Sequence, residues 1–251
     1  MHEFIVLTIF PGMISSLIEN GVLKHAITNK LISILPVGIR DFATGKHRIT
    51  DDRPYGGGCG MIMKPEPIVA AINSVKKTYP KAHSILLTPQ GRLFTQEIAK
   101  ELSLKESVIL LCGRYEGVDE RIREDYIDDE ISIGDYVLTG GEPAAIIVID
   151  AVARLIPGVL GSDDSAKEDS FSNGLLEYPH YTRPRSFMET VVPDTLLSGD
   201  HKQIRQWRHQ ASLITTIVRR PDMISSADLS EESMDFLKGL RSRIDDLTGS
   251  V

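Results

Sequence analysis

The sequence predicts an α/β protein built on a mainly parallel sheet and followed by a small all-α C-terminal domain. Two observations support the sheet. Short apolar runs rich in β-branched residues recur up to residue 133, and helix-like segments separate several of them. Strands that alternate with helices form parallel sheets covered on both faces. A third observation concerns residues 175–251, which contain helical patterns but no strand-like run.

Five strands are predicted from apolar runs that lack a helical period, and they span 3–9, 31–35, 84–88, 107–112 and 130–133. Helices are predicted over 66–79 and 94–102, where apolar residues recur on one face. The segment 142–158 is predicted to be a helix that is apolar nearly all round, with Asp150 and Arg154 four residues apart. Such a helix must be covered on every side, in a core or by another subunit.

Composition divides the chain into three parts: a domain over 1–160, a flexible linker over 161–174 and a helical domain over 175–251. The residues of the linker are mostly small, polar and acidic, which is typical of connecting segments.

Within the C-terminal domain, a helical wheel of 201–220 predicts a packing face opposite a basic face. The packing face contains Ile204, Trp207, Ala211, Ile214 and Val218, and the basic face Lys202, Arg205, His209 and Arg220. The basic face fits a solvated surface and a contact with an RNA backbone equally well.

Bulk properties narrow the class of protein. The 251 residues carry a net charge of −7, which argues against a protein coated by nucleic acid but permits a local basic stripe. The start has no signal-peptide pattern, and no apolar run approaches the roughly 20 residues that span a bilayer. We therefore expect a cytoplasmic protein without a membrane partner. Two cysteines, Cys59 and Cys112, predict no disulfide framework.

Familiar catalytic and nucleotide motifs are absent. The sequence lacks GxGxxG after a strand, GxxxxGK[ST], GxSxG, HExxH and CxxC. The stretch from Asp169 resembles a calcium loop, but Phe171 and His180 occupy positions that require carboxylates. The histidines form no cluster with ligand spacing, so no metal site is predicted.

Three glycine-rich loops instead follow consecutive strands, at 86–92, 111–121 and 132–144. Ligands of open α/β sheets bind outside the carboxyl ends of the strands, and glycines allow the backbone to approach them closely. A fourth loop, 40–61, contains Arg40, Lys46, Arg48 and Tyr55 and ends in a glycine run. Its composition fits a lid over a polyanion and a disordered surface segment equally well.

Several ordered motifs carry a resemblance that covers essentially the whole chain: "DDRPYGGG", "LTPQGR", "LCGRYEGVDER", "SIGDYVLTGGE", "DAVARLIPGVLG", "LLEYPHYTRP" and "QWRHQASL". In order and spacing they resemble bacterial tRNA (guanine-N1)-methyltransferases, which methylate guanosine 37, just 3′ of the anticodon. The resemblance implies a SPOUT-class fold with a deep trefoil knot in the C-terminal part of the α/β domain, an exception to the rule that chains avoid knots. It also implies an obligate homodimer that binds S-adenosylmethionine in the knot.

The resemblance further implies which residues bind the methyl donor. They come from all three loops: Leu87, Thr88, Pro89 and Gly91 from the first, Gly113, Tyr115, Glu116 and Gly117 from the second, and Ile133, Gly134, Tyr136, Leu138, Gly140 and Gly141 from the third. Mg²⁺ is implied as a second cofactor candidate, with Glu116 or Glu177 as contributors.

The catalytic pair implied by the resemblance is Asp169 and Arg154. A carboxylate at Asp169 would remove the proton from guanine N1, and the Arg154 guanidinium would stabilise the negative charge that develops on O6. The linker is expected to order over the second subunit's site. Contacts with tRNA are expected from Arg40, Lys46, Arg48, Tyr55, Arg183, Arg205 and Arg208, with specificity for guanosine 37 preceded by guanosine 36.

The chain departs from many relatives at Cys59, at Glu177 and at Pro143, where "GEPAA" replaces "GELPA". Three other functions stay open from the sequence. They are a non-catalytic RNA-binding or ribosome-assembly factor of the same fold, a knotted methyltransferase with another RNA target, and an oxidoreductase with an atypical nicotinamide site. The missing dinucleotide fingerprint counts against the last of these.

Overall fold

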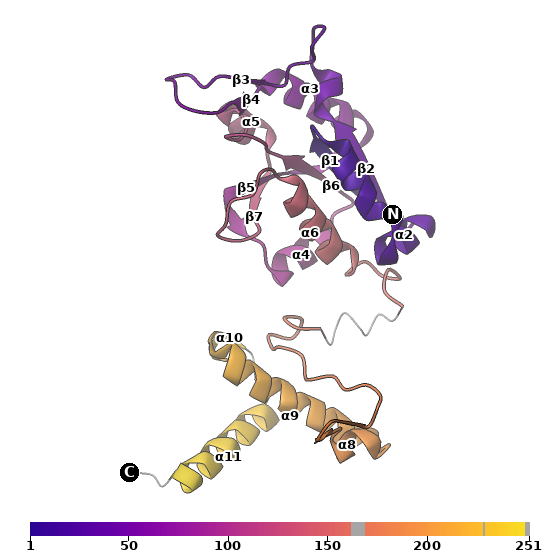
Figure 1. The fold of residues 1–251 in the computed structure, drawn as a ribbon, viewed down its shortest axis with the longest axis vertical. Coiled ribbons are helices and arrows are strands. Elements are labelled where there is room, and N and C mark those ends of the chain that lie inside the picture. The colour runs from indigo at the N-terminus through magenta and orange to yellow at the C-terminus, as the bar shows by residue number, and fades with distance from the viewer. Residues whose placement is uncertain (162–168, 228, 249–251) are drawn as a thin grey trace. The chain divides into compact units, whose positions relative to one another are not determined.

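The computed structural model describes residues 1–161, 169–227 and 229–248. The chain divides into two compact units, Met1–Asp163 and Asp164–Val251 (Figure 1). Part of the predicted linker, 162–168, lies outside the described residues.

The first unit contains a five-stranded sheet in the order β2-β1-β6-β5-β7. Its strands are β1 (His2–Thr8), β2 (Ile32–Gly38), β5 (His83–Leu93), β6 (Ser107–Cys112) and β7 (Asp129–Ser132). Every pair of neighbours is parallel. The five predicted strands and the parallel α/β class are therefore confirmed.

Helices cover both faces of this sheet. One face packs against α1 (Pro11–Ser15), α2 (Gly21–Thr28), α4 (Gln96–Ser103) and α6 (Glu142–Ala153), with the short helix η1 (Ser16–Glu19) beside them. The other face packs against η2 (Ile39–Phe42), α3 (Pro65–Thr78) and α5 (Glu120–Tyr126). The two-residue strands β3 (Asp51–Asp52) and β4 (Ile62–Met63) form a separate antiparallel pair.

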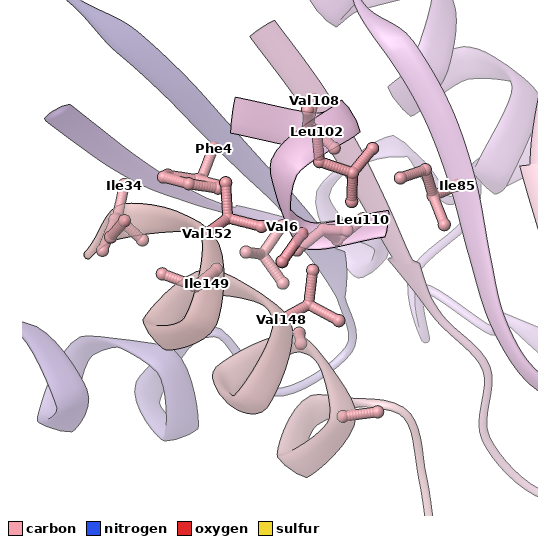
Figure 2. Packing of buried hydrophobic residues seen from close by; sticks show 14 of the residues in the cluster. Phe4, Val6, Ile34, Ile85, Leu102, Val108, Leu110, Val148, Ile149 and Val152 are labelled. Carbon is pink, nitrogen blue, oxygen red and sulfur yellow. The ribbon is translucent and has the colours of Figure 1, made fainter. Parts of the chain in front are cut away.

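Alternate residues of each strand enter opposite halves of the core. In β1, Phe4 and Val6 belong to the cluster on the α6 side, whereas Ile5 and Leu7 belong to the cluster on the α3 side. Figure 2 shows α6 directing its apolar side chains toward the first of these clusters. Each fully buried aliphatic side chain contributes roughly 1.5–3 kcal/mol, so this two-sided burial explains why the strands read as uninterrupted apolar runs.

Local capping explains where several helices begin. The Thr95 hydroxyl accepts a hydrogen bond from the Ile98 N–H at the start of α4, and the Asp119 carboxylate accepts one from the Arg121 N–H at the start of α5. These are preferred N-cap residue types. The Arg121 guanidinium also donates to Asp119 and holds the pKa of that carboxyl below its usual value.

The helix predicted over 142–158 exists, but it ends at Ala153 and is not covered on every side. Its face toward the sheet is buried, whereas Ile147 is 44 % exposed and Asp150 and Arg154 are exposed as well. The chain's own core therefore covers only one side of this helix, and burial of the other side against another subunit stays a prediction. An apolar composition cannot distinguish burial in the chain's own core from burial against another surface.

The prediction that 175–251 is all helical is confirmed only from residue 194 onward. The second unit contains α8 (Asp194–Leu197), α9 (His201–Arg219), α10 (Pro221–Ser226) and α11 (Glu231–Thr248). Before them, β8 (Ser186–Phe187) and β9 (Thr190–Val191) form a small antiparallel hairpin that was not predicted. Strands of two residues are too short to give an alternating pattern.

The predicted packing face of α9 is partly wrong. Ile214 and Val218 are 40 % and 75 % exposed, whereas Ser212, Leu213 and Thr216 are buried. The buried hydroxyls form hydrogen bonds with the backbone of another segment, and a hydrophobic period does not reveal such contacts. Within the described ranges of both units, no helix combines the length and apolar character needed to cross a membrane.

A candidate ligand site at the carboxyl ends of three strands

A cavity of about 480 Å³ lies at the carboxyl ends of β5, β6 and β7. Its volume falls within the usual range of small-molecule sites. The walls come mainly from three loops, at 86–90, 113–118 and 131–141. All the residues expected to bind the methyl donor line this cavity except Gly91.

The first loop is a bulge in β5. Leu87 and Arg92 both pair with Ile131 of β7, so the residues between them leave the ladder and enter the cavity wall. A Cβ atom on Gly91 would lie 2.4 Å from the carbonyl carbon of Glu130. Gly91 therefore lets the bulge close against β7, and it shapes the cavity without lining it.

The second and third loops lie backbone against backbone. The Gly141 N–H donates to the Gly113 carbonyl at 2.9 Å, and Arg114 forms an isolated antiparallel bridge with Gly140. A Cβ atom on Gly141 would lie 2.7 Å from the Cα of Cys112. Glycine is needed there because the backbones approach more closely than a side chain permits.

A buried ion pair that the sequence analysis missed connects these loops to the sheet. The Arg114 Nε donates to Glu142 Oε2 at 2.8 Å, and Thr8 Oγ1 donates to Glu142 Oε1 at 2.5 Å. The Glu142 side chain is fully buried, and Arg114 also donates to the Thr139 carbonyl at 3.1 Å. Its guanidinium further stacks on Phe10, 4.8 Å from the ring centroid. Arg114 and Glu142 each follow a glycine in the quoted motifs, and this position was the only feature of the sequence that pointed to a role for them.

The thiol of Cys112 lies at the base of the same region. Burial, and secondly the negative charge of Glu142, raise the pKa of this thiol well above its usual value. The thiol therefore stays protonated at neutral pH, and it is unsuited to act as a nucleophile.

The basic loop 40–61 joins the second cavity loop through the residues that follow it. The Met63 N–H donates to the Gly117 carbonyl at 2.9 Å, the Glu116 N–H donates to the Met61 carbonyl at 3.0 Å, and the Asp119 N–H donates to the Met63 carbonyl at 3.1 Å. These bonds form a short parallel ladder between the end of the basic loop and the cavity wall.

The residues of this loop that were expected to contact tRNA are accessible. Tyr55 is fully exposed, Lys46 is exposed and Arg40 is half-buried. Arg48 is also exposed, and its guanidinium donates to Asp41 at 2.8 Å.

The two residues expected to carry catalysis belong to different units. Arg154 caps the C-terminus of α6 in the first unit and is exposed there. Asp169 belongs to the second unit. That unit also carries Arg183 and Arg205, both exposed, and Arg208, whose guanidinium stacks on the Tyr178 ring at 4.8 Å.

Carboxylates suited to a metal ion are not clustered in the part of the chain that the structure describes. No group of three or more His, Cys, Asp or Glu side chains is placed there to hold an ion. Glu116 lies in the first unit and Glu177 in the second. No chemical step is assigned to a metal ion.

The fold and the site define an α/β protein with a loop-lined cavity at the strand ends, where ligands of open α/β sheets usually bind. Residues 2–226 match the family model described as tRNA (Guanine-1)-methyltransferase TrmD, and the chain belongs to this family. The resemblance drawn from the sequence motifs is thereby confirmed.

Similar proteins span nearly the whole chain. A tRNA (guanine-N(1)-)-methyltransferase of Geotalea uraniireducens (strain Rf4) is 52% identical over 239 residues, which cover 95% of this chain and 97% of that protein. One from Dehalococcoides mccartyi (strain CBDB1) is 56% identical over 227 residues, covering 90% and 92%. The crystal structure of tRNA (m1G37) methyltransferase from Aquifex aeolicus matches with a TM-score of 0.72 and 43% identity, covering 92% of this chain and 97% of that one.

Proposed function

We propose that this protein transfers a methyl group from S-adenosylmethionine to N1 of guanosine 37 in tRNA. The observation that carries the proposal is the convergence of three glycine-rich loops on one cavity in a chain of the tRNA (guanine-1)-methyltransferase family. The glycines of these loops allow backbone groups to approach a flat ligand closely, and the cavity is large enough for a small-molecule donor. The α/β unit is then the donor-binding domain, knotted as in SPOUT proteins, and the helical unit is the tRNA-binding domain.

The chain's own residues are assigned two tasks in the reaction, proton removal and the stabilisation of negative charge. S-adenosylmethionine supplies a methyl group already activated by its sulfonium, so the protein must chiefly remove the proton from guanine N1. Asp169 is assigned as the general base, and Arg154 is assigned to stabilise negative charge on O6. The exposure of Arg154 at the end of α6 supports a role in contacting a ligand.

The first experiment measures incorporation of a radiolabelled methyl group into tRNA transcripts that carry guanosine or adenosine at position 37. We expect incorporation only with guanosine 37, and a further loss when guanosine 36 is replaced. A protein that binds both transcripts but methylates neither would be a non-catalytic RNA-binding factor. Methylation that persists without guanosine 37 would indicate another RNA target.

The second experiment tests the base. Replacing Asp169→Asn should lower the single-turnover rate about 100-fold or more, the usual contribution of general-base catalysis. Donor binding by calorimetry should stay unchanged. Glu189→Gln removes an exposed carboxylate of the same unit and is the matched control. A normal rate in the Asp169 variant would remove the base assignment.

A homodimer with active sites built from both chains is part of this proposal. The exposed side of α6 supports it, because Ile147 is an exposed aliphatic residue in a line with Asp150 and Arg154. Introducing a charge with Ile147→Glu should shift the protein to monomers in analytical ultracentrifugation and abolish methyl transfer. A fully active monomer would contradict the shared active site.

The residues proposed to contact tRNA lie on both units: Arg40, Lys46, Arg48 and Tyr55 on the first, and Arg183, Arg205 and Arg208 on the second. Contacts between these cations and phosphates should make tRNA binding weaker as salt concentration rises.

Because tRNA is a cytoplasmic molecule, the protein is assigned to the cytoplasm.

A further inference from the structure

The stretch that carries Asp169 is a folded turn within the second unit. The Ser172 N–H donates to the Asp169 carbonyl at 3.1 Å, and the Phe171 N–H donates to the Leu175 carbonyl at 2.8 Å. The Ser170 hydroxyl also accepts a hydrogen bond from the Glu177 N–H at 3.1 Å. These bonds connect the two arms of the turn, so the backbone of Asp169 has a defined place relative to residue 177. We call residues 169–177 the Asp169 turn.

Two buried hydroxyls of α9 hold the distal arm of this turn. The Leu176 N–H donates to Thr216 Oγ1 at 2.9 Å, and the Leu176 carbonyl accepts a hydrogen bond from the Ser212 hydroxyl. Thr216 is fully inaccessible and Ser212 is 8 % exposed. The Thr216 hydroxyl donates in turn to the Ser212 carbonyl at 2.8 Å, one helical turn away.

The hydrogen bonds between Leu176 and α9 should hold the Asp169 turn in place. A buried polar group that loses its partner costs about 1–3 kcal/mol, and both backbone groups of Leu176 use α9 hydroxyls as partners. The two hydroxyls are buried on the side of α9 that the helical wheel assigns to basic residues, so a hydrophobic pattern does not account for their burial.

We propose that Ser212 and Thr216 are positioning residues for methyl transfer, which act by holding the Asp169 turn against α9. This inference rests on the proposed function, in which Asp169 is the base. A misplacement of about 1 Å costs an enzyme about 100-fold in rate, so a base on a connecting segment needs a fixed support. Because the support is α9, which also carries Arg205 and Arg208, the base moves together with the helix that is proposed to grip tRNA.

The test removes the hydroxyls without changing side-chain volume greatly, with Ser212→Ala and Thr216→Val, singly and together. We expect each variant to lower the single-turnover rate at saturating donor and tRNA by about tenfold or more, with unchanged dissociation constants for both. Thr215→Val makes the same chemical change at the neighbouring position and is the matched control. Thr216→Ser keeps the hydroxyl and should keep a rate close to that of the unaltered protein.

A double-mutant cycle separates positioning from general stability. If Ser212 and Thr216 act through Asp169, their replacement should cause no further loss of rate in an Asp169→Asn background. Equal losses in both backgrounds would overturn the proposal, as would a normal rate in the Ser212 and Thr216 variants. If Asp169→Asn itself keeps the normal rate, the base assignment fails instead, so the two failures are distinguishable.

Hydrogen exchange on the unaltered protein is a second measurement, which does not depend on the folding of a variant. The Leu176 amide should exchange much more slowly than an unstructured amide in the absence of tRNA, because its N–H is bonded to a buried hydroxyl. Exchange at the rate of an unfolded peptide would overturn the proposal.

Discussion

The guanidinium of Arg114 donates to the carboxylate of Glu142 at 2.8 Å, in a place where Glu142 has no exposure to solvent. The pair joins the second cavity loop to the first turn of α6, and Thr8 extends the connection to the end of β1. Through the Thr139 carbonyl, Arg114 also contacts the third cavity loop. The ion pair therefore supports the separation of the second and third cavity loops, together with the backbone hydrogen bond between Gly141 and Gly113.

Breaking this pair should destabilise the protein strongly. Replacing Glu142→Gln leaves the Arg114 charge without its counter-ion in a nearly buried position, which costs about 3 kcal/mol or more. Urea unfolding measures this loss, and donor affinity should fall with it. Asp194→Asn breaks the exposed pair with Arg185 and should leave unfolding unchanged. A Glu142 variant as stable as the unaltered protein would show that the pair is not needed.

Adding a single methyl group at Gly91 should damage donor binding. In Gly91→Ala the new Cβ would lie 2.4 Å from the backbone of Glu130, so the β5 bulge must move. Overpacking of this kind costs about 1–3 kcal/mol, and a cost of that size in donor binding lowers the affinity measured by calorimetry about five- to 150-fold. Gly12→Ala is the control because a Cβ there meets no atom within 4 Å. Equal donor affinity in both variants would argue against the bulge as a determinant of the cavity.

Removing a counter-ion should strengthen tRNA binding. Asp41 pairs with Arg48 at 2.8 Å, with their side chains 68% and 60% exposed, so Asp41→Asn frees a proposed phosphate contact at little cost in stability. We expect tRNA affinity to rise about two- to fivefold at low salt and the gain to shrink as salt increases. Asp245→Asn changes the net charge equally on α11 and is the control. An identical gain in both variants would indicate a general charge effect.

His2 should make the protein less stable in mild acid. Burial lowers the pKa of His2 to about 4, and the ring packs against Phe4 in a tilted arrangement with centroids 4.4 Å apart. The folded state thus favours the neutral ring, and the unfolded chain takes up its proton first as pH falls below about 6.5. At pH 5 this proton costs about 2 kcal/mol of the free energy of unfolding. His2→Gln should therefore lose less stability than the unaltered protein between pH 7 and 5 in urea unfolding. Equal losses would show that His2 does not contribute.

The strands and the location of the site were predictable because their signals are local. Strands buried on both faces give apolar runs, and the glycine loops follow those runs directly in the sequence. The bulge was not predictable, since it depends on Leu87 and Arg92 sharing a partner on β7. The Arg114–Glu142 pair was missed because it joins residues far apart in the chain, and only the sheet order brings them together.

The packing of α9, the exposure of α6 and the expected knot could not be predicted from local sequence patterns, each for a different reason. The hydrophobic wheel assigned Val218 of α9 to a packing face, but buried hydroxyls occupy the packed surface instead. The exposure of Ile147 depends on how many sides of α6 one chain can cover. The expected knot came only from the family resemblance, because periodicity in a sequence has no information about how a chain threads through itself.

The ladder between Met61–Met63 and Glu116–Asp119 has a mechanical consequence. A displacement of the basic loop at its C-terminal base must either pull on the cavity wall or break main-chain hydrogen bonds. The basic loop 40–61, which is proposed to contact tRNA, and the second cavity loop, which is proposed to contact the methyl donor, are thus mechanically connected. We therefore expect a ligand bound at either site to change the flexibility of the other.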